Sequence, residues 1–145
     1  MKTNTISNNN FQAYALLILR ITLVLIFLYH GLPKAILWSL ATEKFVSFGL
    51  PGFLGPITGA AEVVASVLLL FGRFWRISNL ALLFIIAGAI ATVQLPNFLA
   101  DSSKVAGLER DILILVGHLV LLAFPPQKKI SIAEDRKEYQ SSKAV

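Results

Sequence analysis

Long apolar runs with almost no charge are the feature that most constrains the fold of this chain. Residues 77–95 include 19 consecutive side chains without a charge, residues 13–31 contain only Arg20, and residues 54–72 contain only Glu62. A helix needs about 20 residues to cross a hydrocarbon core of about 30 Å, with a tolerated range of about 17–25. Because unpaired backbone groups are costly in lipid, a crossing segment must be a helix or part of a closed barrel. These runs lack the alternating polarity of barrel strands, so they predict membrane-spanning helices.

A fourth, shorter run completes the expected set. Residues 112–124 form an uncharged stretch of 13 residues, which reaches 17 if residues 108–111 form the first turn of the helix. We therefore predict an all-α fold, a four-transmembrane-helix bundle, with helices at about 13–31, 54–72, 77–95 and 108–124. Residues 1–126 form the membrane domain, and residues 127–145 form a charged cytoplasmic tail that we expect to be solvated and mobile.

The composition excludes several classes of function. Charged residues make up 14% of the chain, against about 25% in a typical soluble domain. The net charge of +5 is not arranged as a basic stripe with interleaved aromatics, so we expect no nucleic-acid partner. The chain has no cysteine, which excludes disulfides, iron–sulfur clusters and thiolate zinc sites in this chain. We expect no metal site.

The positive charges also predict an orientation. Short cytoplasmic loops carry an excess of lysine and arginine. In the four-helix arrangement, one side carries eight of these residues and both termini, and the other carries four. Both termini are therefore expected in the cytoplasm, in a multi-pass protein of the cell membrane.

The connection between the first two helices is longer than a turn requires. Pro33 and the Gly49–Gly52 segment punctuate it, and residues 35–48 between them are amphipathic. These residues form either a helix along the outer membrane interface or an extension of the first helix beyond Pro33. The sequence supports both alternatives equally.

Three ionisable residues are expected near the middle of the bilayer. With a rise of about 1.5 Å per residue, and with Gly31, Leu54 and Leu108 as outer helix ends, Arg20, Glu62 and His118 lie about 16, 12 and 15 Å deep. A charge at this depth costs about 2.5–3.5 kcal/mol on insertion scales. An ion pair between Arg20 and Glu62 would offset that cost, and its alternative role is to fix helix register without catalysis.

A second polar layer is expected near the outer surface. It is the better place for a ligand, and consists of His30, Lys34, Gln94, Glu109 and Asp111. His30 and His118 differ in depth by about 13 Å, too far for two ligands of one haem iron. Taken singly, His118 is expected to be a hydrogen-bonded core residue, and His30 is open to a ligand or proton.

Several of these residues form a pattern that resembles the DoxX family of small four-helix membrane proteins. The first block comprises Arg20, Phe27-Leu28, His30-Gly31 and Lys34, and the second comprises Gly59, Glu62, Leu68–Leu70, Gly72 and Arg76. Glu109 at the start of the last helix also fits. Ala65-Ser66 and Phe124–Pro126 depart from the pattern where members often carry glycines. The resemblance implies the four-helix fold and, since some members accompany membrane redox complexes, a broad link to redox chemistry.

Together these features favour an integral-membrane subunit or accessory protein of a quinone-linked oxidoreductase system. The candidate ligand-binding or proton-relay residues are Arg20, His30, Lys34, Glu62, Gln94, Glu109, Asp111 and His118. No covalently bound cofactor is expected, quinone is the candidate ligand, and a redox protein or a second copy is the candidate partner within the lipid bilayer. The alternatives are a non-catalytic scaffold or assembly factor and a small permease. Whether the chain is itself an enzyme stays open at this point.

Overall fold

The computed structural model describes residues 5–72 and 74–125, with side chains described from residue 11 onward. These residues form helices joined by short connections, and no strand occurs among them. The prediction of an all-α fold is therefore confirmed for this part of the chain. The predicted tail at residues 127–145 lies outside the described residues.

Helix α1 is longer than predicted and runs from Thr5 to Ile36. It passes through Pro33, although a proline inside a helix removes one backbone hydrogen bond. The helix axis breaks only at Leu37, after which α2 begins and spans Trp38–Ser47. Both alternatives for the first connection are thus met in part, since α1 extends past Pro33 by three residues and residues 38–47 form a separate helix.

A tight turn joins α3 (Leu54–Leu70) to α4 (Trp75–Ala89). Gly72 has a φ of +69°, in the left-handed region that favours glycine, and Phe74 adopts a φ of 55°. These two positive φ values reverse the chain within a few residues. As a result, α3 and α4 pack against each other beside the turn.

The third predicted helix contains a π-helical turn. After α4, residues Ile90–Gln94 form η1, in which the backbone N–H of Leu95 bonds to the carbonyl of Ile90. Helix α5 (Leu95–Ala100) continues with Pro96 in its first turn. A short 3₁₀ turn, η2 (Ser102–Lys104), then leads into α6 (Val105–Ala123).

The carboxylate of Asp101 stabilises the connection between α5 and α6. It accepts hydrogen bonds from the backbone N–H of Ser103 at 3.0 Å and from the Ser103 hydroxyl at 2.7 Å. These bonds favour the ionised carboxylate, so they lower the pKa of Asp101.

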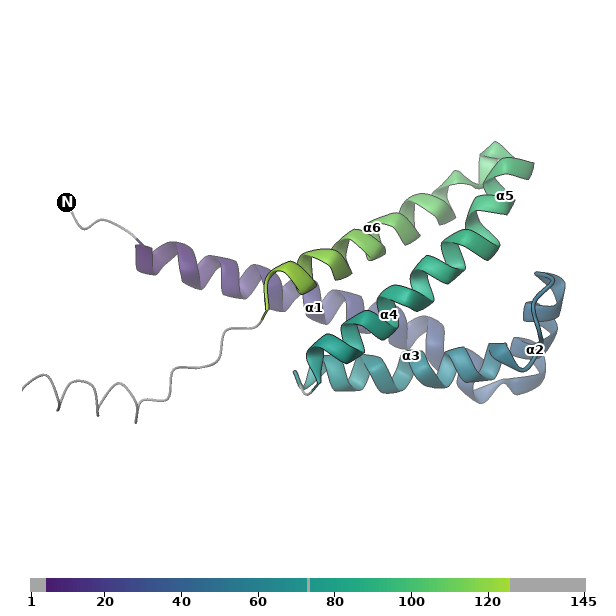
Figure 1. Cartoon of the computed structure of the whole chain (residues 1–145), viewed down its shortest axis with the longest axis horizontal. Helices are drawn as coiled ribbons and strands as arrows, with labels where there is room; N and C mark the ends of the chain where they lie inside the picture. The colour runs from purple at the N-terminus through teal and green to yellow at the C-terminus, as the bar shows by residue number, and fades with distance from the viewer. Residues whose placement is uncertain (1–4, 73, 126–145) are drawn as a thin grey trace, which may run out of the picture.

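The helices are arranged as a V of two antiparallel pairs (Figure 1). One arm consists of α1 and α3, and the other of α4 and α6. The arms meet where α3 packs on α4 and α1 on α6, and they separate toward the end that carries α2 and α5 (Figure 1).

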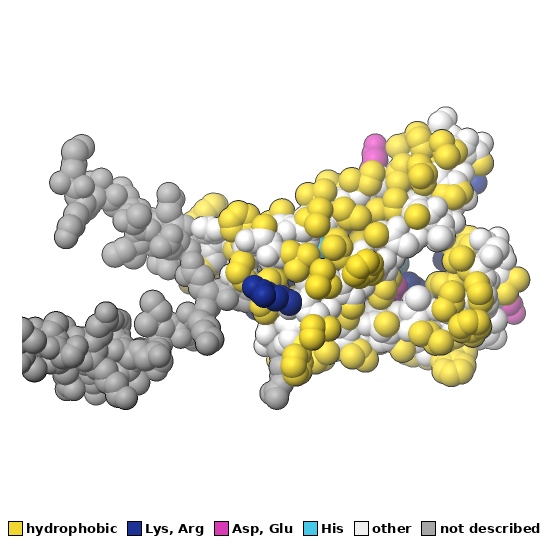
Figure 2. All heavy atoms as spheres, in the orientation of Figure 1, with side chains coloured by type: hydrophobic (Ala, Val, Ile, Leu, Met, Phe, Trp, Pro, Cys, Tyr) yellow, Lys and Arg dark blue, Asp and Glu magenta, His cyan; other side chains and the backbone are white. Residues whose placement is uncertain are grey.

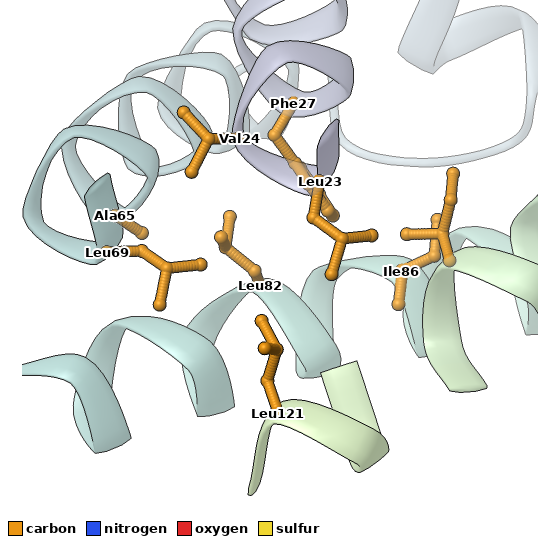
Figure 3. Packing of buried hydrophobic residues seen from close by; sticks show 9 residues of the cluster. Leu23, Val24, Phe27, Ala65, Leu69, Leu82, Ile86 and Leu121 are labelled. Carbon is orange, nitrogen blue, oxygen red and sulfur yellow. The ribbon is translucent and has the colours of Figure 1, made fainter. Parts of the chain in front are cut away.

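The core lies where the two arms meet. Its buried side chains come from all four long helices, with Leu23, Val24 and Phe27 on α1, Ala65 and Leu69 on α3, Leu82 and Ile86 on α4, and Ile114 and Leu121 on α6. Figure 3 shows these side chains converging between the helices. The core therefore fixes how the arms are joined and where the V opens.

The surface of the helices is apolar over most of its area (Figure 2). Large side chains such as Ile18 and Leu25 are 65% and 60% exposed. Two helical segments, Phe11–Ile36 and Trp75–Ala100, are long and apolar enough to cross a membrane, and only 17% and 22% of their apolar windows are buried. Apolar exposure on this scale is typical of a surface that contacts lipid or another protein.

Candidate functional site

Two glycines allow α1 and α3 to approach closely. A Cβ atom on Gly31 would lie 2.8 Å from Cβ of Glu62, and a Cβ on Gly59 would lie 2.6 Å from Cβ of Lys34 and 2.7 Å from the backbone nitrogen of Ala35. Small residues at helix interfaces permit such contacts between backbones. Gly31 and Gly59 thus bring Lys34 and Glu62 together.

Lys34 and Glu62 form an ion pair between these two helices. The Nζ atom of Lys34 donates to Oε1 of Glu62 at 2.5 Å, and the side chains are 28% and 3% exposed. The second carboxylate oxygen, Oε2, is buried and has no hydrogen-bond partner among the described residues. The expected pairing of Glu62 with Arg20 is therefore wrong, because Lys34 occupies that place.

Arg20 lies instead beside the turn between α3 and α4. Its Nη1 atom is 3.5 Å from the position that a Cβ on Gly72 would take. The prediction failed because α1 ends at Ile36 and not at Gly31, which places Arg20 about 24 Å from the outer end of the helix. Glu62 lies only about 12 Å from the start of α3, so the two residues are at different levels.

His118 lies apart from both Arg20 and Glu62. Its Nδ1 atom is hydrogen-bonded to Oδ1 of Asn79, and its ring contacts Phe27 edge-to-face, with centroids 5.3 Å apart. The three residues expected at one midplane level therefore have three different environments. The expectation that His118 is a hydrogen-bonded core residue is confirmed.

Asn79 is a buried polar residue that the sequence reasoning missed. It is 0% exposed on α4, and its amide also donates to the backbone carbonyl of His118 at 3.0 Å. A signal was present, because an asparagine inside an apolar run needs a partner. The two predicted polar layers contain ionisable residues and Gln94 but not Asn79.

The second arm brings a second ion pair to the opening of the V. The Nε atom of Arg110 donates to Oδ1 of Asp111 at 2.8 Å, and Asp111 is 2% exposed. His30 of α1 and Arg110 of α6 line the same pocket, which places this ion pair next to α1. Together with Gln94, described next, His30, Lys34 and Asp111 make four of the five residues predicted for the outer layer that lie at or near this opening.

Gln94 packs against α6, and Glu109 does not join the group. The side-chain amide of Gln94 occupies the space that a Cβ on Gly107 would need. Asp111 follows Gly107 by one helical turn on the same face. Glu109 is exposed, so its carboxylate points away from the buried Asp111.

We call the opening of the V the cleft; His30 and the Lys34–Glu62 pair belong to one arm, and the Arg110–Asp111 pair belongs to the other. Figure 2 shows a hollow between the two arms in which acidic and basic side chains are visible. Beside it lies an open pocket of about 570 Å³, lined by Leu25, Ile26, Leu28, Tyr29, His30 and Arg110. Ligand pockets commonly measure about 300–1,000 Å³ and combine apolar walls with a few polar groups.

The cleft offers hydrogen-bond donors next to a buried carboxylate. An imidazole and a guanidinium can donate to carbonyl oxygens of a ligand, and the free oxygen of Glu62 can accept a proton. Among the described residues, no three His, Cys, Asp or Glu side chains are close enough to hold a metal ion. Donors next to apolar walls suit an organic ligand with a polar head and an apolar body.

Comparison with known proteins identifies relatives. The chain is 36% identical over 88 residues to a Bacillus subtilis (strain 168) protein named "Putative oxidoreductase CatD", and the match covers 61% of this chain and 65% of that protein. The matched part thus spans just under two thirds of the relative. No solved structure matches.

The match to a protein family rests on the first three long helices. Residues 15–95, which are more than half of the 145 residues, match the DoxX family. This range includes Gly31, Lys34, Gly59 and Glu62, the residues that form the contact and the ion pair between α1 and α3. The chain belongs to the DoxX family, whose members are membrane-associated.

Proposed function

We propose that this chain is an integral-membrane subunit or accessory protein of a quinone-linked oxidoreductase system. In this proposal α1, α3, the continuous α4–η1–α5 segment and α6 each cross the cell membrane, with both termini in the cytoplasm. The name of the Bacillus subtilis relative supports an association with an oxidoreductase. The observation that carries the quinone proposal is the pocket, in which apolar side chains lead to His30 and Arg110.

A quinone fits the chemistry of this pocket. It is an apolar ring with two carbonyl oxygens, and each oxygen needs a hydrogen-bond donor when it leaves water. His30 and Arg110 supply those donors, while Leu25, Ile26 and Leu28 contact the ring. Leu25 and Tyr29 are 60% and 77% exposed, so in a membrane the pocket is open to lipid.

Proton transfer in this proposal uses Glu62. Reduction of a quinone requires protons as well as electrons, and a carboxylate near the carbonyl oxygens can deliver them. Oε2 of Glu62 is unpartnered and Oε1 is paired with Lys34. Lys34 therefore holds the carboxylate in place, and a redox protein partner delivers the electrons.

Quinone binding by the purified protein tests this function. We expect the protein in lipid nanodiscs to bind ubiquinone or menaquinone, and His30→Ala and Arg110→Ala each to weaken binding by about tenfold, the effect of one lost hydrogen bond of about 1.4 kcal/mol. Arg76→Ala is the matched control, because Arg76 is exposed on α4 beside Trp75. Equal binding by all four proteins, or none by the wild type, would contradict the proposal.

A scaffold or assembly factor is the second candidate, and the tight packing of α1 on α3 favours it. Gly31, Gly59 and the Lys34–Glu62 pair fix the register of these two helices whether or not a ligand binds. Glu62→Gln separates the two functions. If the ion pair only fixes packing, Glu62→Gln lowers the yield of folded protein and leaves quinol oxidation by membranes unchanged. If Glu62 transfers protons, the folded variant oxidises quinol more slowly.

A further inference from the structure

A group of buried polar side chains lies away from the cleft, where the four long helices meet. Ser66, Ser78, Asn79 and His118 are between 0% and 2% exposed, and they come from α3, α4 and α6. We call this group the crossing site. Apolar side chains of the core surround it, so each polar atom there needs a partner inside the protein.

The hydrogen bonds of Asn79 determine the tautomer of His118. The Nδ2 atom of Asn79 donates to the backbone carbonyl of His118, and the opposite amide orientation would place two oxygens against each other. Oδ1 of Asn79 therefore faces Nδ1 of His118. Since this oxygen can only accept, Nδ1 carries the proton.

The Nε2 atom of His118 is then an acceptor without a donor. Burial in an apolar environment disfavours a charged ring unless an opposite charge is nearby, and no carboxylate bonds to His118 among the described residues. The neutral ring with a proton on Nδ1 has a lone pair on Nε2. That atom is buried and has no hydrogen-bond partner in the described part of the chain.

Two serine hydroxyls, like Nε2 of His118, are buried without a hydrogen-bond partner within the residues that the structure describes. Oγ of Ser66 and Oγ of Ser78 are buried without a partner among the described residues. A serine or threonine in a helix often bonds to the carbonyl one turn earlier, as Thr58 does to Leu54 and Thr92 to Gly88. Ser66 and Ser78 do not, so their hydroxyls remain available to another group.

The helix register brings these groups to one level. Gly31 faces Glu62, and one turn further along each helix the same antiparallel register sets Phe27 opposite Ser66. The ring of Phe27 contacts His118, and Ser78 is adjacent to Asn79 on α4. Ser66, Ser78 and His118, from three helices, therefore lie at one level of the core.

We propose that the crossing site binds a buried water molecule that donates a hydrogen bond to Nε2 of His118 and bonds to the hydroxyls of Ser66 and Ser78. Buried waters typically make about three hydrogen bonds to polar groups that otherwise lack partners. This water joins α3, α4 and α6, and it fixes His118 as a neutral acceptor. His118 is then a packing residue, and proton transfer in the cleft does not involve it.

The tautomer is tested by ¹⁵N NMR of histidine-labelled protein in nanodiscs. The chain has two histidines, so His30→Gln leaves only the signals of His118. We expect a neutral ring protonated on Nδ1 with a hydrogen-bonded Nε2, and Asn79→Leu should populate the other tautomer. A His118 ring protonated on Nε2 in the His30→Gln protein would overturn the proposal.

The water is tested in the same protein by cross-relaxation between water and the ring protons of His118. We expect this signal in His30→Gln, and we expect Ser66→Val to remove it and to lower the Tm by roughly 3–8 °C, about the effect of one buried hydrogen bond. Thr92→Val is the control, because its hydroxyl bonds to its own exposed helix. If Ser66→Val does not fold, Ser66→Ala and Ser78→Ala give the same readout. The proposed water would be contradicted if His30→Gln gave no water signal. It would also be contradicted if the ¹⁵N chemical shift of Nε2 in His118 were unchanged in the Ser66 and Ser78 variants.

Discussion

Glu62 is the residue in which packing and proposed chemistry meet. Its carboxylate is 3% exposed inside an apolar helix pair, where an isolated charge is costly. Lys34 offsets that cost, while Gly31 leaves the space in which the Glu62 side chain lies. A substitution at any of these positions therefore changes the environment of the same carboxylate.

Removing the lysine should destabilise the protein more than removing the pair. Breaking a buried ion pair costs about 3–5 kcal/mol, because one charge stays buried without a partner. Since Lys34 is 28% exposed, we expect Lys34→Met to cost about 3 kcal/mol, at the low end of that range. The double variant Lys34→Met/Glu62→Met should lose less stability than Lys34→Met alone, measured by unfolding in detergent. Additive losses would show that the two side chains do not interact.

At this scale the sequence predicted the residue types of the site but not their partners. His30, Lys34 and Asp111 were placed in one outer layer; the structure pairs Lys34 with Glu62 and Asp111 with Arg110, and His30 lines a pocket with Arg110. Glu62 was assigned to the wrong partner because depth depends on where each helix ends, and α1 extends past its proline. Asn79 was missed, since its role follows from a neighbour 39 residues away.

At the scale of elements, the contact of α1 with α3 is the best-defined packing in the molecule. Two glycines, one on each helix, remove the side chains that would keep the backbones apart. In lipid, packing of this kind replaces the hydrophobic effect as the force that associates helices. The pair α1–α3 should therefore tolerate added volume poorly.

Adding one methyl group at the contact tests this packing. A Cβ on Gly59 would meet backbone atoms of α1 at 2.7 and 2.8 Å, so we expect Gly59→Ala to lower stability by about 2 kcal/mol, within the range for overpacking. Gly88→Ala is the matched control, because nothing lies within 4 Å of its added Cβ. It should stabilise the helix by about 0.5–1 kcal/mol. Equal effects of the two substitutions on thermal unfolding would exclude a specific contact at Gly59.

The existence of the long helices followed from the apolar runs, whereas their interruptions did not. The length of the uncharged apolar runs located α1, α3, α4 and α6. The π-helical turn at Ile90–Gln94 depends on how the chain adapts before Pro96 and packs Gln94 on Gly107. Such a turn is a response to tertiary contacts, so local sequence does not specify it.

At the scale of the whole molecule, the proposed ligand site depends on the V formed by the two arms. A bundle closed along its whole length would bury the ion pairs of both arms. Here the core holds the arms together at one end, and the arms separate at the other (Figures 1 and 2), where the basic partners Lys34 and Arg110 are 28% and 49% exposed. Hydrophobic patterning shows which residues avoid water, but it does not give the angle between helix pairs, which depends on the shapes of the packed side chains.

The proposed four crossings predict which loops face each side of the membrane. Because the chain contains no cysteine, single cysteines can be introduced without removing native ones. Glu43 on α2 and Lys104 in η2 are exposed at the end that carries α2 and α5, and Arg76 is exposed near the opposite end. In intact cells, a membrane-impermeant maleimide should label Glu43→Cys and Lys104→Cys, and should label Arg76→Cys only after the membrane is opened. This pattern tests the crossings of α3 and the α4–α5 segment, since Glu43 and Lys104 share the side opposite to Arg76 only if both segments span the bilayer. Labelling of Arg76→Cys in intact cells would therefore exclude the proposed topology, either by reversing the orientation or by leaving α3 outside the bilayer.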